Sequence, residues 1–301
     1  MTFSLSIIGA GRLGGALAIA LDRRGYEIKS LVSLNSKNAV QIASKLSSQP
    51  QLLSISEIDQ LHFAPLILIA TPDSQIELTA ERLAALEIFR QNQSATFLHT
   101  SGALDSNVLN VLPKNKIGSL HPLISVSDAQ TGAEKFKNVY FCLEGGPEAV
   151  AAGAQIVLDL EGISFSIPTE EKPLYHAAAV LSSGHLVALF DLAIAMLAKC
   201  GLSIDEAQKV LLPLVQSTIE NLAAQTPAAA LTGTFARADV ETMNRHLAAL
   251  SDFADALKVY CELGRRSLNL AARQGADPGK LREMDKILEN AEEKVRNKKE
   301  F

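Results

Sequence analysis

The sequence predicts an α/β protein in which a doubly wound parallel sheet of the Rossmann type precedes an all-helical domain. Three observations predict this fold. A glycine-rich turn follows the first strand pattern, strand and helix patterns alternate up to residue 167, and alanine-rich and leucine-rich helix patterns replace them after Pro168. We therefore expect a Rossmann dinucleotide-binding domain over residues 1–167 and an all-helical domain for substrate binding and dimerisation over residues 168–301.

The glycine-rich turn lies within the segment S-L-S-I-I-G-A-G-R-L-G, residues 4–14. An apolar run, Leu5–Ile8, predicts a buried strand, and the glycines follow it with the spacing G-x-G-x-x-G. Gly9 allows a tight turn, Gly11 lets a pyrophosphate approach the backbone, and Gly14 lets the next helix pack closely. The N–H groups and the positive dipole end of that helix would face the phosphates. The pattern therefore predicts a dinucleotide site.

Strand and helix patterns alternate through the rest of the first domain. The run L-I-L-I-A, within residues 65–70, is typical of a parallel strand covered on both faces. This alternation predicts a doubly wound sheet. The expected strands lie over residues 27–33, 51–54, 65–70, 96–99, 116–120, 139–143 and 164–167, and the expected helices over residues 12–24, 37–46, 74–91 and 147–160.

The second half contains only helix patterns, over residues 171–199, 203–225, 227–231, 240–249, 252–273 and 278–298. The segment 174–200 is apolar on nearly every side and long enough to span a bilayer. However, His176, His185 and Asp191 interrupt it, and no aromatic or basic girdle flanks it. A helix that is apolar all round is normally buried. We therefore expect it to form the core of the helical domain or a homodimer interface, without a membrane.

The composition limits the classes of function. A chain of 301 residues with 48% hydrophobic and 20% charged residues is typical of a soluble globular protein. The net charge of −5 argues against nucleic acid as the main partner. The three cysteines (Cys142, Cys200 and Cys261) lie far apart and the first strand leaves no room for a signal peptide, so we expect a cytoplasmic protein with reduced thiols. No cluster has zinc-site spacing, so we expect no metal.

The end of the second strand bears on the choice of cofactor. NAD sites usually carry an acidic residue there, but the segment S-L-N-S-K at residues 33–37 has none. Its hydroxyl, amide and ammonium groups suit a 2′-phosphate, which favours NADP over NAD; alternatively, Asn35 and Ser36 only cap the next helix. The residues expected to bind the cofactor are Gly9, Ala10, Gly11, Arg12, Leu13, Gly14, Asn35, Ser36, Lys37, Ala70, Thr71, Pro72 and Thr100.

Loops at the carboxyl ends of the strands are expected to surround the reacting atoms. Hydride transfer involving a carbinol, carbonyl or imine needs a nearby proton donor or acceptor, and histidine suits this role. His121 is the leading catalytic candidate. Ser101 is expected to bond a substrate oxygen or the nicotinamide amide, with a simple turn as the alternative. For His99, an inward orientation as a core histidine is the alternative to a place in the site.

The long apolar helix is expected to supply the other wall of the site. Helical geometry places His176, Val180, Ser183 and Gly184 on one face and Ser182 and His185 on the other. We expect the first face to line the site, with His176 as a catalytic residue that orients the substrate and Ser183 as a substrate contact. His185 is expected to lie in the core or in a dimer contact.

Four ordered motifs support a resemblance: H-T-S-G at residues 99–102, G-S-L-H-P-L at 118–123, Y-H-A-A-A-V at 175–180 and A-L-T-G-T-F-A-R-A-D at 230–239. Together they resemble bacterial proteins that join a Rossmann-like domain to a helical domain of unknown function 2520, within the 6-phosphogluconate dehydrogenase-like group of NADP oxidoreductases. The resemblance implies a homodimer with interlocked helical domains. The G-S-L-H-P-L segment also resembles the histidine-proline segment of prephenate dehydrogenase, which supports His121.

The resemblance also marks Thr232, Gly233, Arg237 and Asp239 as candidate site residues. It implies that Arg237 clamps a substrate carboxylate or phosphate; a structural Arg–Asp pair in a turn is the alternative. The sequence departs from related dehydrogenases, which carry Lys-x-x-x-Asn on the long helix, because no lysine lies between Leu174 and Ala198.

The leading hypothesis is an NADP-dependent oxidoreductase that acts on a small, anionic metabolite. The alternatives are a non-catalytic dinucleotide-binding sensor and a reductase of a deazaflavin or flavin partner.

Overall fold

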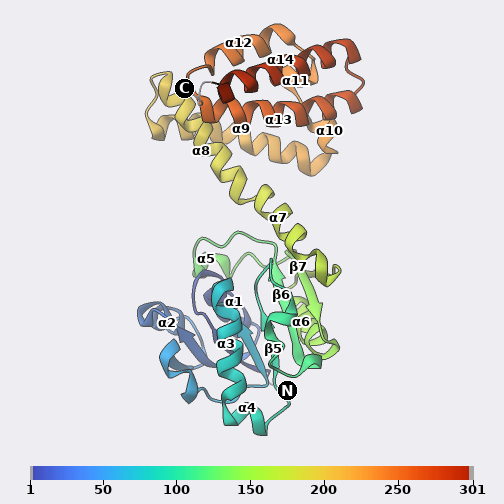
Figure 1. The fold of residues 1–301 in the computed structure, drawn as a ribbon. Helices are drawn as coiled ribbons and strands as arrows, with labels where there is room; N and C mark the ends of the chain where they lie inside the picture. The colour runs from blue at the N-terminus through green and yellow to red at the C-terminus, as the bar shows by residue number, and fades with distance from the viewer. Residues whose placement is uncertain (1–2, 298–301) are drawn as a thin grey trace. The chain divides into compact units, whose positions relative to one another are not determined.

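A computed structural model describes residues 3–297 of the chain (Figure 1). The chain forms two compact units, one ending at Leu186 and the other beginning at Val187. The first unit contains a mixed α/β fold, and the second contains helices alone within its described residues.

The first unit is built on one eight-stranded sheet with the order β3-β2-β1-β4-β5-β6-β7-β8. All neighbouring strands are parallel except β6 and β7, which are antiparallel. The Rossmann-type α/β class is therefore confirmed, with one departure from an all-parallel sheet. The strands are β1 (Ser4–Ile8), β2 (Glu27–Ser33), β3 (Gln51–Ser54), β4 (Leu66–Ile69), β5 (Thr96–His99), β6 (Ile117–Pro122), β7 (Tyr140–Gly145) and β8 (Ile163–Phe165).

Helices cover both faces of this sheet. The apolar runs serve two cores because successive strand residues point to opposite faces: Leu68 belongs to one core, whereas Ile67 and Ile69 belong to the other. The helices are α1 (Arg12–Arg23), α2 (Ser36–Ala43), α3 (Asp73–Ala85), α4 (Glu87–Gln91), α5 (Ala129–Gly132) and α6 (Pro147–Asp159) (Figure 1).

One helix and one strand of the first unit differ from the expected elements. The helix expected over residues 74–91 is interrupted at Leu86, whose backbone is extended (φ −69°, ψ 127°), so α3 and α4 are separate. The strand expected over residues 116–120 continues to Pro122, because β6 pairs with β7 as far as Phe141. His121 consequently lies within a strand, directly opposite Cys142.

Helix α7 (Lys172–Ser182) belongs to the first unit, although the sequence places the domain boundary at residues 167/168. Its first turns are attached to the sheet: Lys172 is fully buried, and Tyr175 hydrogen-bonds His121. The backbone of Ser183 leaves the helical region (φ −126°, ψ −77°), so the helix expected over residues 171–199 is divided into α7 and α8 (Gly184–Lys199).

The second unit has its own apolar core, which includes Met243, Cys261, Met284 and Leu288. Ser203 and Glu206 form a capping box at the start of α9, where the sequence predicts a helix. The unit contains most of α8 together with α9 (Ile204–Ala224), α10 (Pro227–Ala230), α11 (Gly233–Ala236), α12 (Val240–Ala249), α13 (Ala254–Arg273) and α14 (Pro278–Asn297). Lys298, the expected last residue of α14, lies outside the described residues.

The long apolar segment is not buried within this chain. Residues 169–199 are long enough to cross a membrane and contain an 18-residue window with a mean hydropathy of 1.8, in which no residue is buried. The expectation of a buried core helix is therefore wrong for the single chain. Val187 of α8 is 69% exposed, and Leu214 of the following helix α9 is 63% exposed. His185 is also exposed.

Candidate active site

The glycine turn joins β1 to α1 and has the geometry that its spacing predicts. Gly9 has φ +102°, and a Cβ there would lie 2.5 Å from the Ala70 carbonyl. A Cβ at Gly14 would overlap the Gly9 carbonyl oxygen. In contrast, a Cβ at Gly11 would meet nothing within 4 Å. Gly9 and Gly14 are therefore needed for the fold, whereas the space at Gly11 is available to a ligand.

The N-terminus of α1 is suited to an anionic group. No side chain caps it, and no acidic residue lies in its first turn. The first helical hydrogen bond is donated by the Gly15 N–H to the Gly11 carbonyl, so earlier N–H groups of the helix remain for a ligand. The buried Thr71 hydroxyl has no hydrogen-bond partner in the described part of the chain. These features fit the pyrophosphate of a dinucleotide.

The end of β2 presents an exposed polar segment. Asn35 accepts a hydrogen bond from the Lys37 N–H at 3.0 Å, which confirms its role as the cap of α2. The side chains of Ser36 and Lys37 are exposed, and no acidic residue lies in the first turn of α2. This segment would accept a 2′-phosphate without repulsion from a carboxylate. Arg12 is also exposed, at the start of α1.

The ends of β1, β4 and β5 lie side by side and bring other predicted cofactor residues together. The Ala70 N–H donates to the Ile8 carbonyl at 2.7 Å, and the Thr100 N–H donates to the Ile69 carbonyl at 3.0 Å. Pro72 is the N-cap residue of α3. Ala10 is buried in the turn and Leu13 packs against the core, so their contribution to a dinucleotide site would come from the backbone.

Ser101 is engaged by its own loop. Its hydroxyl donates to an Asp73 carboxylate oxygen at 2.9 Å and accepts the N–H groups of Ala103 and Leu104 at 3.1 and 3.0 Å. This arrangement favours the turn over the expected substrate contact. His99 is fully buried and satisfied, because Nε2 lies 3.1 Å from the Asp105 carbonyl and Nδ1 accepts the Ser101 N–H. His99 is therefore a core histidine.

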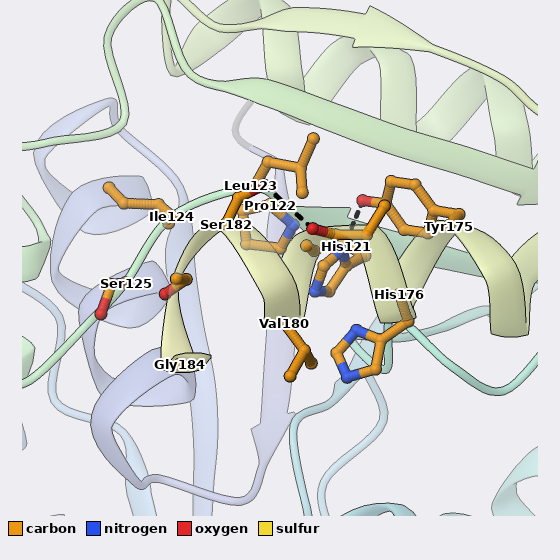
Figure 2. Close-up of a pocket in the computed structure, with 13 residues that line it drawn as sticks. His121, Pro122, Leu123, Ile124, Ser125, Tyr175, His176, Val180, Ser182 and Gly184 are labelled. Carbon is orange, nitrogen blue, oxygen red and sulfur yellow. Dashed lines mark hydrogen bonds between the residues drawn. The ribbon is translucent and has the colours of Figure 1, made fainter. Parts of the chain in front are cut away.

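Two histidines converge on Gly102. A Cβ at Gly102 would lie 2.7 Å from Nε2 of His121 and would overlap Nδ1 of His176. The two imidazole rings meet edge to face with centroids 5.7 Å apart. Nδ1 of His121 lies 2.6 Å from the Tyr175 hydroxyl oxygen, whereas the buried Nδ1 of His176 has no partner among the described residues. Figure 2 shows His121 between Tyr175 and His176.

The surroundings favour a neutral imidazole at His121. Burial lowers its pKa to about 4, with further lowering by the positive charge of Lys172 and by His176. Burial also raises the pKa of the Tyr175 phenol. At neutral pH, His121 can therefore accept a proton at one nitrogen while it donates from the other.

Lys172 is a site residue that the sequence analysis missed. Its ammonium group is buried and donates to the Ser101 carbonyl at 2.9 Å and to the Ser119 hydroxyl at 2.5 Å. Burial lowers its pKa, while the acidic groups nearby, Glu144 first among them, act in the opposite direction. A lysine in the first turn of a helix is usually exposed, so no pattern in the sequence indicates this orientation.

A cavity of about 590 Å³ lies beside the histidines within the first unit (Figure 2). The face of α7 that the sequence analysis favours does line it. Its walls are residues 121–125 of β6 and the following loop, and Tyr175, His176, Ala178, Ala179, Val180, Ser182, Ser183 and Gly184. Arg237 lies in the second unit, exposed, directly after α11. Thr232 precedes α11, and Asp239 caps α12 by accepting the Thr242 N–H.

Comparisons with known proteins agree with this architecture. Residues 1–123 match a Rossmann-like domain, and residues 139–267 match the domain of unknown function DUF2520. Among curated proteins, none matches the sequence.

Several solved structures share the fold. BF3122 from Bacteroides fragilis, named a candidate NADP oxidoreductase, is 26% identical with a TM-score of 0.72, and the match covers 89% of this chain and 98% of that one. Protein TM1727 from Thermotoga maritima is 23% identical with a TM-score of 0.74, over 89% and 99% of the two chains. The NADP-bound pyrroline carboxylate reductase of Plasmodium falciparum is 14% identical with a TM-score of 0.57, over 94% and 98%.

Proposed function

We propose that this chain, which belongs to the family that joins a Rossmann-like domain to the DUF2520 domain, is an NADP-dependent oxidoreductase. It transfers hydride between the nicotinamide ring and a small metabolite. The observation that carries the proposal is the glycine turn, where the space at Gly11 adjoins the uncapped N-terminus of α1. The similarity to BF3122 and the shared fold with an NADP-bound reductase support a nicotinamide cofactor.

NADP is favoured over NAD because the end of β2 lacks an acidic residue. The 2′-phosphate would be held by Ser36 and Lys37, with Arg12 as a further cation. The pyrophosphate would lie over Gly11 and accept hydrogen bonds from N–H groups of α1 and from the Thr71 hydroxyl. Calorimetric titration with NADPH and NADH tests the preference, and tighter binding of NADH would contradict it.

His121 would manage the proton of the reaction. NADP, when bound, accepts or supplies the hydride. With the Nδ1 proton donated to the Tyr175 oxygen, Nε2 of neutral His121 faces Gly102 with a free electron pair. In the oxidative direction this nitrogen accepts the proton that leaves the substrate hydroxyl or amine and then releases it to solvent. In the reductive direction His121 takes a proton from solvent and donates it to the carbonyl oxygen or imine nitrogen. His176 would orient the same substrate atom.

The structure supports a substrate contact by Ser183 more than one by Ser101 or Arg237. Ser183 lines the cavity and is available to a substrate, whereas the Ser101 hydroxyl is engaged within its loop. The expectation of an anionic metabolite depends on Arg237, which lies in the second unit. The proposed chemistry does not require that charge.

Turnover tests the enzymatic proposal. We expect purified protein to oxidise NADPH in the presence of some member of a panel of carbonyl and imine compounds. The His121→Asn variant should lose at least about a hundredfold in rate, the usual contribution of an acid–base residue, while it retains NADPH affinity. NADPH binding without turnover of any compound would instead support a dinucleotide sensor.

We also propose that the protein is a homodimer whose interface includes α8 and α9. Val187, Leu214 and Ile219 are at least half exposed in the single chain, and such apolar surface is normally covered. Leu214→Arg should convert the dimer to a monomer in light scattering. Gln208→Arg adds the same charge at an exposed polar position of α9 and should leave the dimer intact. A wild-type monomer would contradict the proposal.

A further inference from the structure

We propose that the cavity beside His121 and His176 binds a neutral molecule with one polar carbonyl or imine group and an apolar body. This inference rests on the proposed function for the role of the polar group, but it concerns recognition and can be tested without turnover. It follows from the histidine end of the cavity, from the apolar walls and from the positions of the charged groups nearby.

The histidine end of the cavity is suited to one polar ligand atom. Nδ1 of His176 is buried and has no partner among residues 3–297, and a buried polar atom without a partner is costly. Nε2 of His121 lies next to it above Gly102, where any side chain would fill the space. The absence of a side chain at Gly102 thus leaves two imidazole nitrogens close together. When the Tyr175 hydroxyl donates to Nδ1 of His121, Nε2 carries the proton. A single carbonyl oxygen or imine nitrogen can then accept from Nε2 of His121 and from a protonated Nδ1 of His176.

The walls of the cavity suit an apolar body. On one side they consist of Pro122, Leu123 and Ile124, and on the other of Ala179 and Val180 of α7. Ser125, Ser182 and Ser183 add hydroxyl groups to the lining. No Asp, Glu, Lys or Arg lines this cavity among the described residues. A ligand carboxylate or ammonium group would therefore lose its hydration without gaining a partner of opposite charge.

The buried charged groups Lys172 and Glu144 do not line the cavity. Lys172 donates to the Ser101 carbonyl and the Ser119 hydroxyl and is fully buried, so it does not reach a ligand. Glu144 is also buried; its Oε2 accepts a hydrogen bond from the Ser106 hydroxyl at 2.9 Å, while its Oε1 has no partner among the described residues. Because neither group lines the cavity, neither supplies a countercharge to a ligand there.

Binding of three unreactive probes of equal length tests the inference. Hexanamide carries a neutral carbonyl, hexanoate a negative charge and hexylammonium a positive charge. Each is titrated into the full-length protein, and the ring signals of His121 and His176 are followed by NMR, assigned with the His121→Asn and His176→Asn variants. We expect hexanamide to bind at least about tenfold more tightly than either ion, because the wall offers no countercharge.

Chain length and a charged wall provide two further readouts. Each CH₂ added between butanamide and hexanamide should improve the affinity by up to about fourfold, the value for a fully buried methylene. Val180→Lys places a cation on the wall and should reverse the preference toward hexanoate. Leu181→Lys is the matched control, since Leu181 is 65% exposed and does not line the cavity.

The outcomes separate this inference from the proposed function. Equal or tighter binding of hexanoate by the wild-type protein would overturn the inference, even if NADPH binds and is oxidised. A preference for hexanamide with perturbed His121 and His176 signals supports it, even if no NADPH binds. Reversal by Leu181→Lys as well as by Val180→Lys would show a general effect of surface charge and would also overturn it.

Discussion

The two glycines at the start of α1 should respond to alanine in opposite ways. At Gly14, which is buried, a Cβ would overlap the Gly9 carbonyl oxygen and would lie 3.0 Å from the Ala70 Cβ. The backbone must shift to accommodate it, and overpacking of this kind costs about 1–3 kcal/mol. At about 2–4 °C per kcal/mol for a unit of this size, Gly14→Ala should lower Tm by ~2–12 °C.

At Gly11 the same substitution meets no protein atom within 4 Å, and the backbone is extended with φ −87°. The loss of a favourable N-cap glycine and the reduced freedom of the unfolded chain act in opposite directions, so the free energy of unfolding should change by less than about 1 kcal/mol. The Cβ would instead stand where the pyrophosphate approaches. Losing even one charge-assisted hydrogen bond, at about 1.5–3 kcal/mol, weakens NADPH binding by about 10- to 150-fold.

The assay is thermal unfolding and NADPH fluorescence titration of both variants beside the wild type; the chain has no Trp, so protein emission interferes little. We expect the Gly11→Ala protein to keep a normal Tm and to bind NADPH weakly. Binding of NADPH by Gly11→Ala within a factor of two of the wild type, or a wild-type Tm for Gly14→Ala, would refute this expectation.

Two further predictions concern the buried histidines and Lys172. Lys172→Met should raise the pKa of His121 in an NMR titration, because it removes a nearby positive charge. The control Ser119→Ala breaks one hydrogen bond of Lys172 but leaves its charge, so it should change the pKa of His121 less. Equal pKa changes in the two variants would contradict this prediction. Burial lowers the pKa values of His99 and His121 to about 3 and about 4, so the unfolded chain binds more protons below its histidine pKa of about 6.5. The free energy of unfolding should therefore be constant above about pH 6.5. Below about pH 6.5 it should fall by up to ~1.4 kcal/mol per pH unit for each of the two histidines. Urea unfolding that shows no such decline between about pH 5 and 6.5 would contradict the burial of neutral His99 and His121.

The sequence predicts the fold well where local patterns suffice. Strand residues such as Ile67 and Leu68 face two different cores, and this produces the uninterrupted apolar runs that indicate a doubly wound sheet. The direction of β7 could not be predicted, since an apolar run has the same composition in either direction. The interruption at Ser183 also has no pattern of its own in an otherwise apolar segment.

The candidate site is only partly visible in the sequence. Helical spacing groups His176, Val180, Ser183 and Gly184 on one face, and all four line the cavity. Ser182, which the same spacing places on the other face, lines it as well, as the last residue of α7 before the interruption at Ser183. The burial of Lys172 depends on hydrogen-bond partners from β6 and the loop after β5, which lie far away in the sequence. Apolar composition also indicates that α8 needs a covered surface, but it does not indicate what covers it.

A crystal structure of the protein with NADPH tests the central claim most directly. We predict density for the pyrophosphate over Gly11, within hydrogen-bonding distance of the N–H groups in the first turn of α1 and of the Thr71 hydroxyl. Pyrophosphate density elsewhere in the first unit, with the Gly11 turn empty, would contradict the account.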